Sequence, residues 1–261
     1  MDEVMVTVVC VTYNHAAFIR DALEGFVAQQ APWRFEVLVH DDASTDGTAE
    51  IVREYERRYP DLIRGVYQTE NQYSKGVNIS RTFLHPLIRG RYVALCEGDD
   101  YWTDPHKLEM QVAALEARPG VDICAHRALR IKGGKPRGHV APAPFDRLFP
   151  AKRVILGGGY FVATASLLCR REAYLRQTPM REILANDYSL QIQCSLRGGM
   201  YYLHKCMSVY RKGTPGSWSS QHRSRNAAFR QRRTRMLEAL DEYTEGRYHR
   251  VIRRRLRHYA H

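Results

Sequence analysis

Residues 92–102 read Tyr92-Val93-Ala94-Leu95-Cys96-Glu97-Gly98-Asp99-Asp100-Tyr101-Trp102, an acidic loop directly after a short apolar strand. At the carboxyl end of a parallel strand, side chains face the crevice where open α/β sheets bind ligands. Three carboxylates within four residues repel one another unless a cation lies between them. Mg²⁺ and Mn²⁺ prefer such oxygen ligands and typically add substrate phosphates. The stretch therefore predicts a divalent-metal site, and a solvated acidic turn is the alternative.

The first 126 residues alternate between strand and helix patterns. Short apolar runs with β-branched residues predict strands over residues 4–11, 35–40, 62–67, 91–96 and 121–126. Helical spacing of apolar residues predicts helices over residues 16–30, 48–59, 78–89 and 105–117. This alternation with short links predicts an α/β fold, in which helices cover both faces of a mostly parallel, Rossmann-like sheet.

The pattern changes after residue 126. Residues 127–150 contain Gly133-Gly134, several prolines and basic residues, and predict a surface excursion that covers a site or is mobile. An apolar segment over 160–169, a helix over 187–197 and a strand over 200–204 follow, and residues 211–220 are loop-like. We expect a body over residues 1–220, with halves at 1–126 and 127–220, and a helical tail over 221–261.

A second acidic loop, residues 40–48, follows the second predicted strand in the same way. Asp41 and Asp42 precede three residues that are able to cap the next helix, and capping is the structural alternative for this loop. A carboxylate here is able to accept hydrogen bonds from the imide of a uracil-type base or from ribose hydroxyls. Tyr13, just after Val11 at the end of the first strand, is placed to stack on a base. Three strand ends are thus expected to meet at one nucleotide-sized site.

These segments resemble a known family. Residues 8–14, 41–48 and 97–100 are similar, in order and spacing, to the signature of inverting family 2 glycosyltransferases of the GT-A fold. Residues 71–78 resemble the Asn/Gly segment that precedes the third helix of that family. The resemblance covers residues 4–126 strongly and residues 160–220 more loosely.

The resemblance implies a nucleotide-sugar donor and a divalent metal, Mn²⁺ or Mg²⁺, that bridges the donor diphosphate. In the motif at residues 97–99, Asp99 is the direct metal ligand, with Asp100 second, and Glu97 stands where the family more often has Asp. Glu97 is expected to face the ribose or a metal-bound water. Asp42 matches the base-recognising residue, with Asp41 beside it. The implied donor-binding residues are Val11, Tyr13, Asp41, Asp42, Lys75, Glu97, Gly98, Asp99 and Arg211.

The resemblance also implies a general base near the start of a later helix. Asp187 fits that position, with Asn186 where the family commonly has Glu, and the alternative is that Asp187 only caps its helix. An inverting transfer needs one carboxylate that deprotonates the acceptor hydroxyl as it attacks the anomeric carbon. Asn186 and Trp218 are expected to contact the acceptor, although Trp218 fits a core position equally well.

Charge is unevenly distributed along the 261 residues. The formal net charge is +12, and residues 221–261 hold twelve Arg against four acidic residues. Helical spacing of apolar residues in this tail predicts docking on the body or self-association. Contact with an anionic membrane or a polyprenyl-phosphate acceptor is the alternative. No motif supports nucleic-acid binding.

The first residues, the short apolar runs and the cysteines predict a cytoplasmic protein. Peripheral attachment to the inner face of the plasma membrane is the alternative. The start, Met1-Asp2-Glu3, is acidic, unlike a signal peptide, and no apolar run reaches the ~18 residues of a membrane span. The six cysteines contain no Cys-x-x-Cys pair and are expected to be buried free thiols.

Rival enzyme classes lack their motifs. The first strand is followed by neither the Gly-x-Gly-x-x-Gly turn of dinucleotide enzymes nor a P-loop. A sugar nucleotidyltransferase needs a Gly-rich, basic loop there and is the runner-up. A degenerate nucleotide- or glycan-binding module is the non-enzyme alternative, against which the intact Asp99, Asp100 and Asp187 argue. The sequence predicts inverting transfer of one sugar, UDP-linked in the donor, to a hydroxyl of a glycan or lipid-linked glycan.

Overall fold

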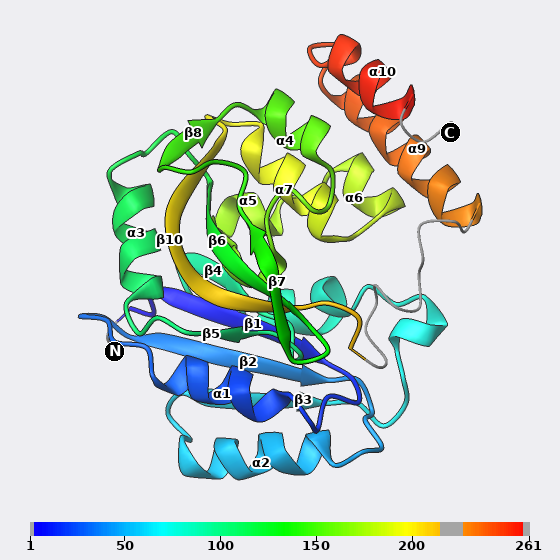
Figure 1. The fold of residues 1–261 in the computed structure, drawn as a ribbon. Coiled ribbons are helices and arrows are strands. Elements are labelled where there is room, and N and C mark those ends of the chain that lie inside the picture. The colour runs from blue at the N-terminus through cyan, green and yellow to red at the C-terminus, as the bar shows by residue number, and fades with distance from the viewer. Residues whose placement is uncertain (1–2, 215–226, 258–261) are drawn as a thin grey trace.

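A computed structural model describes residues 3–214 and 227–257 of the chain. Its centre is one sheet in the strand order β3-β2-β1-β4-β9-β6-β10-β5, with β7 on β6 and β8 on β10 (Figure 1). The strands are β1 (Val6–Thr12), β2 (Phe35–Asp41), β3 (Ile63–Tyr67), β4 (Tyr92–Leu95), β5 (Tyr101–Trp102), β6 (Ile123–Lys132), β7 (Lys135–Val140), β8 (Arg147–Phe149), β9 (Leu168–Arg170) and β10 (Met200–Arg211).

Strand β1 is the axis of the parallel part of the sheet. It pairs in parallel with β2 on one side and with β4 on the other, and β2 pairs in parallel with β3. The β-branched run over residues 6–11 favours this central, two-sided position because such side chains pack well on a pleated surface buried on both faces. Since the strands run in one direction, their carboxyl ends lie at the same edge of the sheet.

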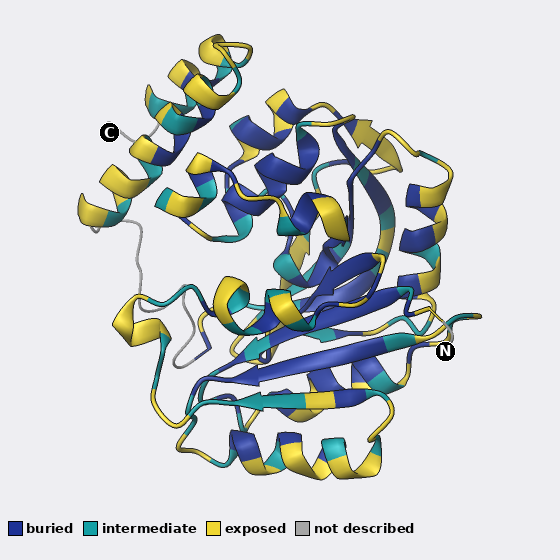
Figure 2. Cartoon of the chain, turned by 180° about the vertical axis from the view of Figure 1, so that it is seen from behind, coloured by how far each residue is buried: buried dark blue, intermediate teal, exposed yellow. Residues whose placement is uncertain are grey.

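Helices cover both faces of the sheet. Val8 and Cys10 of β1 pack with α1 (Ile19–Val27), α2 (Thr48–Arg58) and α3 (Lys107–Glu116). Val9 points to the other face and packs in the core formed with α4 (Ala151–Gly157), α5 (Arg171–Leu175), α6 (Pro179–Ile183) and α7 (Asp187–Ser195). Figure 2 shows the buried inner sides of these helices around the buried strands. The predicted α/β class with two helical layers is confirmed.

The segment between β3 and β4 is less regular than the predicted helix over residues 78–89. A short 3₁₀ turn, η1 (Tyr73–Lys75), is followed by a π-helical turn, η2 (Ser80–Leu84), and a second 3₁₀ turn, η3 (His85–Leu87). Pro86 lies in η3, and its missing N–H and its ring prevent a continuous α-helix.

Most of residues 127–150 lie at the surface as predicted, but they form strands rather than an irregular excursion. Strand β6 continues to Lys132, turns at Gly133 and Gly134, and returns as β7. Both glycines have positive φ, 56° and 72°, as a two-residue hairpin turn of type I′ requires. Strand β10 is longer than the predicted 200–204 because β6 pairs with it as far as Arg211 and β5 pairs with Ser208 and Val209.

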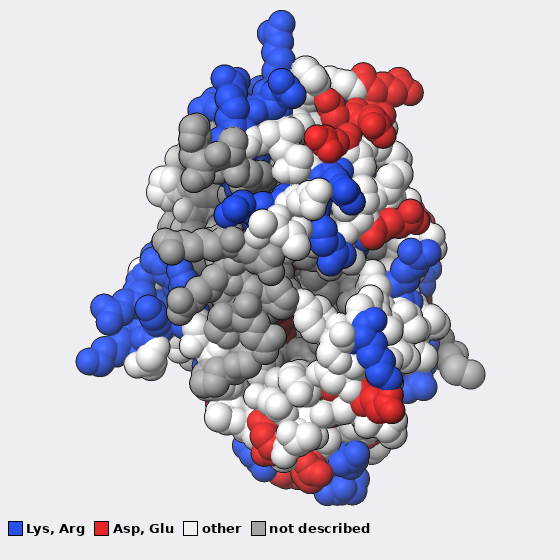
Figure 3. Space-filling model, turned by 90° about the vertical axis from the view of Figure 1, so that its right-hand side faces the viewer, with Lys and Arg blue, Asp and Glu red and all other residues white. Residues whose placement is uncertain are grey.

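The tail forms two helices, α9 (Ala227–Tyr243) and α10 (His249–Arg257), which dock on the body (Figure 1). Their buried apolar side chains, Met236, Leu237, Leu240 and Ile252, belong to the same core as α7. Exposed arginines of α10 face outward, and Lys and Arg gather at the top of the face shown in Figure 3. The apolar side of the tail is thus occupied by the body itself. Its contact with a membrane or a second subunit stays a prediction, as do the boundaries at residues 126 and 220.

Two expectations from composition concern cysteines and membrane spans. All six cysteines are free, five are buried as predicted, and Cys206 is half-buried. Among the described helices, none combines the length and the apolar character that crossing a bilayer requires.

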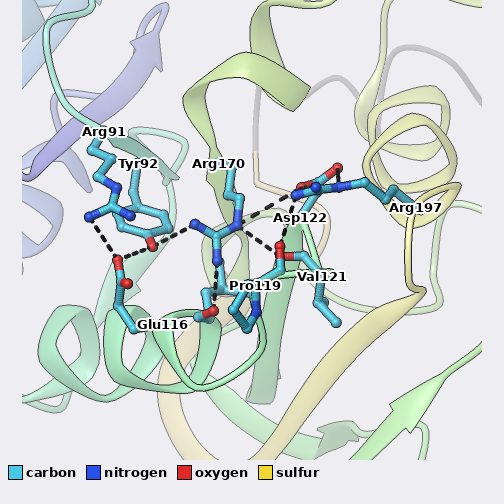
Figure 4. A network of polar contacts seen from close by, with 9 residues as sticks. Arg91, Tyr92, Glu116, Pro119, Val121, Asp122, Arg170 and Arg197 are labelled. Atoms are coloured by element: carbon cyan, nitrogen blue, oxygen red, sulfur yellow. Dashed lines mark hydrogen bonds and ion pairs between the residues drawn. The ribbon is translucent and has the colours of Figure 1, made fainter.

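A polar network centred on Arg170 of β9 joins α3 to the sheet (Figure 4). The guanidinium donates to the Leu115 carbonyl at 2.7 Å, the Val121 carbonyl at 3.1 Å and the Tyr92 hydroxyl at 2.9 Å. Beside it, Asp122 is 2% exposed and accepts from Arg197 Nε at 3.0 Å. These contacts fix where α3 ends and β6 begins.

We expect Asp122→Ala to lower the free energy of unfolding by about 2–4 kcal/mol, because it removes the carboxylate that pairs with both Arg170 and Arg197 and leaves the largely buried Arg170 guanidinium without a countercharge. Urea unfolding measures this. The control is Glu54→Ala, which removes an exposed ion pair with Arg20 and should barely move the transition. Equal effects of the two substitutions would contradict the role given to Asp122.

Candidate active site

The loops after β1 and β2 are joined to each other by side-chain caps. Asn14 N donates to Ser44 Oγ at 2.9 Å, and Thr45 N donates to Asn14 Oδ1 at 2.8 Å. Ala16 N donates to Asp46 Oδ2 at 2.9 Å. The polar residues after Asp42 therefore hold the two loops in register, which extends the capping role that the sequence suggested.

Asp41 and Asp42 are both buried but differ in their partners. Asp42 Oδ1 accepts from Gln72 N at 2.9 Å, and Asp42 Oδ2 accepts from Tyr73 N at 3.0 Å, so its carboxylate anchors the segment before η1. Asp41 Oδ2 accepts from Ser44 N at 3.0 Å, whereas Asp41 Oδ1 is buried without a partner among the described residues. Asp41 therefore keeps one acceptor atom for a ligand.

Gly98 brings the loop after β4 against β1. Its N–H donates to the Val11 carbonyl at 3.0 Å. A Cβ at this position would lie 2.5 Å from Thr12 Oγ1 and 2.7 Å from Thr12 Cβ. Only glycine permits this approach, which positions the carboxylates on either side of it.

Asp99 and Asp100 are buried acids in this loop, 6% and 1% exposed. Asp99 Oδ2 accepts from Thr214 Oγ1 at 2.6 Å. Asp100 Oδ1 accepts from Arg211 N at 2.7 Å, while Asp100 Oδ2 is buried with no partner among the described residues. Burial, and then the charges of Asp99 and Glu97, raise the pKa of Asp100 well above its usual range.

Glu97 lies near the start of the same loop. Solvent reaches its side chain, but the surrounding protein removes enough water to raise its pKa to about 8, and the charges of Asp99 and Asp187 add to the effect. The carboxylates of Glu97, Asp99 and Asp187 thus lie near enough to repel one another. A bound cation would relieve that repulsion.

Asp187 is the first residue of α7, and Asn186 caps that helix in its place. Ser189 N donates to Asn186 Oδ1 at 3.0 Å, and Asn186 N donates to Ser189 Oγ at 3.2 Å, a complete capping box. Asp187 Oδ1 accepts a hydrogen bond from Tyr188 N at 2.8 Å. The alternative in which Asp187 only caps α7 therefore does not hold.

The surroundings of Asp187 shift its protonation toward neutral pH. Burial raises the pKa of this carboxyl to about 6, and the Tyr188 amide and the charge of Arg233 moderate the rise. A Cβ at Gly159 would lie 3.8 Å from Asp187 Oδ1, so the glycine loop after α4 packs directly against the carboxylate. A carboxylate with this pKa suits proton transfer near pH 7.

Several predicted ligands are engaged elsewhere. Arg211 donates to the Asp99 carbonyl at 2.9 Å, forms an ion pair with Asp21 and lies 4.4 Å from the centre of the Tyr101 ring. Its guanidinium therefore braces the acidic loop. Lys75 pairs with Glu70 at the surface.

The other predicted ligands differ in their burial and in whether their polar atoms are already hydrogen-bonded. Val11 and Tyr13 are half-buried at the edge of the site. The amide oxygen of Asn186 is occupied by its capping bond. Trp218 lies outside the described residues.

Sequence reasoning missed two residues of the site, Gly159 and Thr214. Gly159 belongs to the run Gly157-Gly158-Gly159, and such a run signals close approach of the backbone to another group. Thr214 lies in a segment predicted only as loop, and no local pattern marks it as a partner of Asp99.

No preformed metal cage is present in the part of the chain that the structure describes. Within it, no three His, Cys, Asp or Glu side chains converge on one point. Asp99 and Asp100 nevertheless fit the open type of site, in which one or two carboxylates hold the cation and substrate phosphates complete its shell.

The model of one protein family, described as glycosyl transferase family 2, matches residues 7–178. The chain belongs to glycosyl transferase family 2. It is accordingly a glycosyltransferase, and the family membership predicted from its motifs is confirmed.

Its relatives in sequence include proteins from several bacteria. An uncharacterised protein of Mycobacterium tuberculosis is 34% identical over 244 residues, which cover 92% of this chain and 69% of that protein. A Bacillus subtilis protein provisionally named teichuronic acid biosynthesis glycosyltransferase TuaG is 28% identical, with 79% of each chain covered.

Solved structures share the fold of this glycosyltransferase. S. aureus TarS 1–349 in complex with UDP-GlcNAc superposes with a TM-score of 0.69 at 17% identity, covering 91% of this chain and 66% of that one. The mannosyltransferase PcManGT from Pyrobaculum calidifontis, in complex with GDP-Man and Mn²⁺, gives a TM-score of 0.58 at 21% identity, covering 93% and 65%. The GT-A prediction is confirmed, and the chain spans about two thirds of each of these structures.

We expect Gly98→Ala to destabilise the protein by about 1–3 kcal/mol, because the new methyl group would overlap Thr12 in a packed site. Thermal or urea unfolding measures the change. The control is Gly120→Ala, where a Cβ would meet no atom within 4 Å. If Gly98→Ala is as stable as this control, the two loops do not depend on close contact.

Proposed function

We propose that the protein transfers a single sugar, with inversion, from a UDP-linked donor to a hydroxyl of a glycan or lipid-linked glycan. Asp187 is the general base, and a divalent cation assists at Asp99 and Asp100. One observation carries the proposal: Asn186 rather than Asp187 caps α7, and Asp187 lies near enough to the acidic loop that its charge adds to the effects of burial and of Asp99 on the pKa of Glu97.

The nucleotide end of the crevice is formed by the loops after β1 and β2. Asp41 Oδ1 is buried and has no hydrogen-bond partner within residues 3–214 and 227–257, and a uracil imide N–H would supply that donor. We therefore assign base recognition to Asp41 rather than Asp42, whose two oxygens already hold the backbone of Gln72 and Tyr73. Tyr13 lies on the preceding loop for stacking on the base. TarS, with the same fold, is known in complex with UDP and with UDP-GlcNAc.

The acid pair is suited to a divalent cation. Asp99 and the unpartnered Asp100 Oδ2 would hold Mn²⁺ or Mg²⁺ against the donor diphosphate. When bound, the ion stabilises negative charge on the departing nucleoside diphosphate. Arg211 keeps both carboxylates in place through the Asp99 carbonyl and Asp100 Oδ1. PcManGT, which shares the fold, binds Mn²⁺ with its donor.

The transfer itself needs one proton acceptor on the acceptor side. The acceptor oxygen forms its bond to the anomeric carbon as the bond from that carbon to the diphosphate oxygen breaks, and the hydroxyl proton passes to Asp187. Attack from the face opposite the leaving group inverts the anomeric configuration. A pKa of about 6 leaves Asp187 ionised at neutral pH and basic enough to take the proton.

Relatives suggest the class of acceptor. TuaG is named for teichuronic acid biosynthesis. Escherichia coli WfgD, 30% identical over 115 residues, is named a glucosyltransferase that acts on GlcNAc-diphosphoundecaprenol. A lipid-linked acceptor would place the enzyme at a membrane surface, and the exposed arginines of α10 suit anionic lipids.

Asp187→Asn should lower kcat by about 10²–10⁴-fold with little change in UDP affinity, because only the proton acceptor is lost. In the native enzyme, kcat/KM should rise with pH through about 6 and then level, since the base acts only when ionised. Steady-state UDP release measures both. Glu182→Gln, an exposed acid near the same helix, is the control. Near-native turnover in Asp187→Asn would remove Asp187 as the base.

Asp41→Asn should weaken UDP binding about tenfold without loss of stability. The amide NH₂ of the new Asn would face the imide N–H of the base, so that two donors would meet where a donor and an acceptor met before. Asp42→Asn should instead lower the melting temperature, because it frees one backbone N–H of the segment that it anchors. Calorimetry with UDP and thermal unfolding separate the two effects. Weaker binding and unchanged stability in Asp42→Asn, with native binding in Asp41→Asn, would return the role to Asp42.

A further inference from the structure

A cavity lies close to the loop that packs against Asp187. Its volume is about 620 Å³, and it lies between the β6–β7 hairpin, the end of β10 and the loop after α4. Three cations line it, Arg130, Arg153 and Lys212, together with the aromatic rings of Tyr160 and Tyr210. Among the described residues that form its wall, none is acidic.

The three positive charges are not neutralised by the described parts of the protein. Arg130 donates to the Arg137 carbonyl at 2.7 and 3.1 Å, a contact with no countercharge. Arg153 and Lys212 form no ion pair within residues 3–214 and 227–257. Lys212 Nζ lies 5.8 Å from the centre of the Tyr160 ring, which is itself 69% exposed. Cations concentrated in a concave site attract an anionic ligand.

Two segments of the chain line the cavity and also contact the acids of the proposed site. Gly157 and Tyr160 line the cavity, and Gly159 between them packs against Asp187. On the other side, Lys212 follows Arg211, whose N–H holds Asp100. None of the residues around the cavity comes from the loops at 41–48 or 71–78. It therefore belongs to the acceptor side rather than the nucleotide end.

We propose that this cavity is an anion subsite for the acceptor. Arg130, Arg153 and Lys212 bind a phosphate or carboxylate carried by the acceptor glycan, while Tyr160 and Tyr210 pack against a sugar ring. A ligand held there presents its hydroxyl toward Asp187 past Gly159. The inference rests on the proposed function and deepens it, because it makes the acceptor acidic.

The test uses the full-length protein with saturating UDP, which keeps anionic probes out of the donor site. The probes are methyl glucoside, methyl glucuronide and glucose 6-phosphate, and calorimetry or ligand-observed NMR gives their affinities. The variant is Arg153→Gln with Lys212→Gln. The matched control is Lys152→Gln with Arg57→Gln, which removes the same charges at exposed positions outside the cavity.

We expect at least one anionic probe to bind about tenfold or more tightly than methyl glucoside, and to lose that advantage in the cavity variant only. Preference for glucose 6-phosphate identifies a phosphate ligand, and preference for methyl glucuronide a carboxylate. Equal affinities of the three probes, or equal losses in variant and control, would overturn the subsite. UDP binding, measured by titrating the same proteins before UDP is added, tests the proposed function separately, because it does not involve the cavity.

Discussion

The parallel pairing of β1 with both β2 and β4 is the constraint on which the rest of the site depends. It sets Thr12 opposite Asp41 and Val9 opposite Leu95, so three polar loops leave the sheet at one edge. Backbone bonds continue the register past the strands, from Asp42 N to the Thr12 carbonyl at 3.1 Å and from Gly98 N to the Val11 carbonyl at 3.0 Å. The positions of the acids therefore follow from sheet geometry rather than from contacts among the acids themselves.

That geometry holds together groups that are unfavourable without a ligand. Asp41 Oδ1, Asp100 Oδ2 and Thr12 Oγ1 are buried without partners in the described structure. Buried polar atoms of this kind normally find hydrogen bonds, so their clustering around one crevice indicates where a donor and a cation would be stabilised. Burial, together with the charges of the neighbouring acids, raises the pKa values of Glu97 and Asp100, and a bound cation would offset both effects.

Much of the fold and the position of the site could be predicted from sequence, because β-branched runs and the acids after them are local patterns. The turn between β6 and β7 could also have been predicted, since Gly133-Gly134 is by itself a hairpin turn signal. The choice between Asp41 and Asp42 could not, because it depends on where the backbone of Gln72 and Tyr73 returns. The contacts of Arg211 could not be predicted for a similar reason: its partner, Asp21, is far away in the chain and close only after folding.

The central claim is that one crevice at the edge of β1, β2 and β4 binds the nucleotide and the cation together. Anomalous scattering from Mn²⁺ in crystals grown with UDP tests it most directly. We predict one peak between Asp99, Asp100 and the diphosphate, with the uracil imide next to Asp41 Oδ1. A Mn²⁺ peak away from residues 97–100, or a nucleotide bound outside the loops after β1 and β2, would contradict the account.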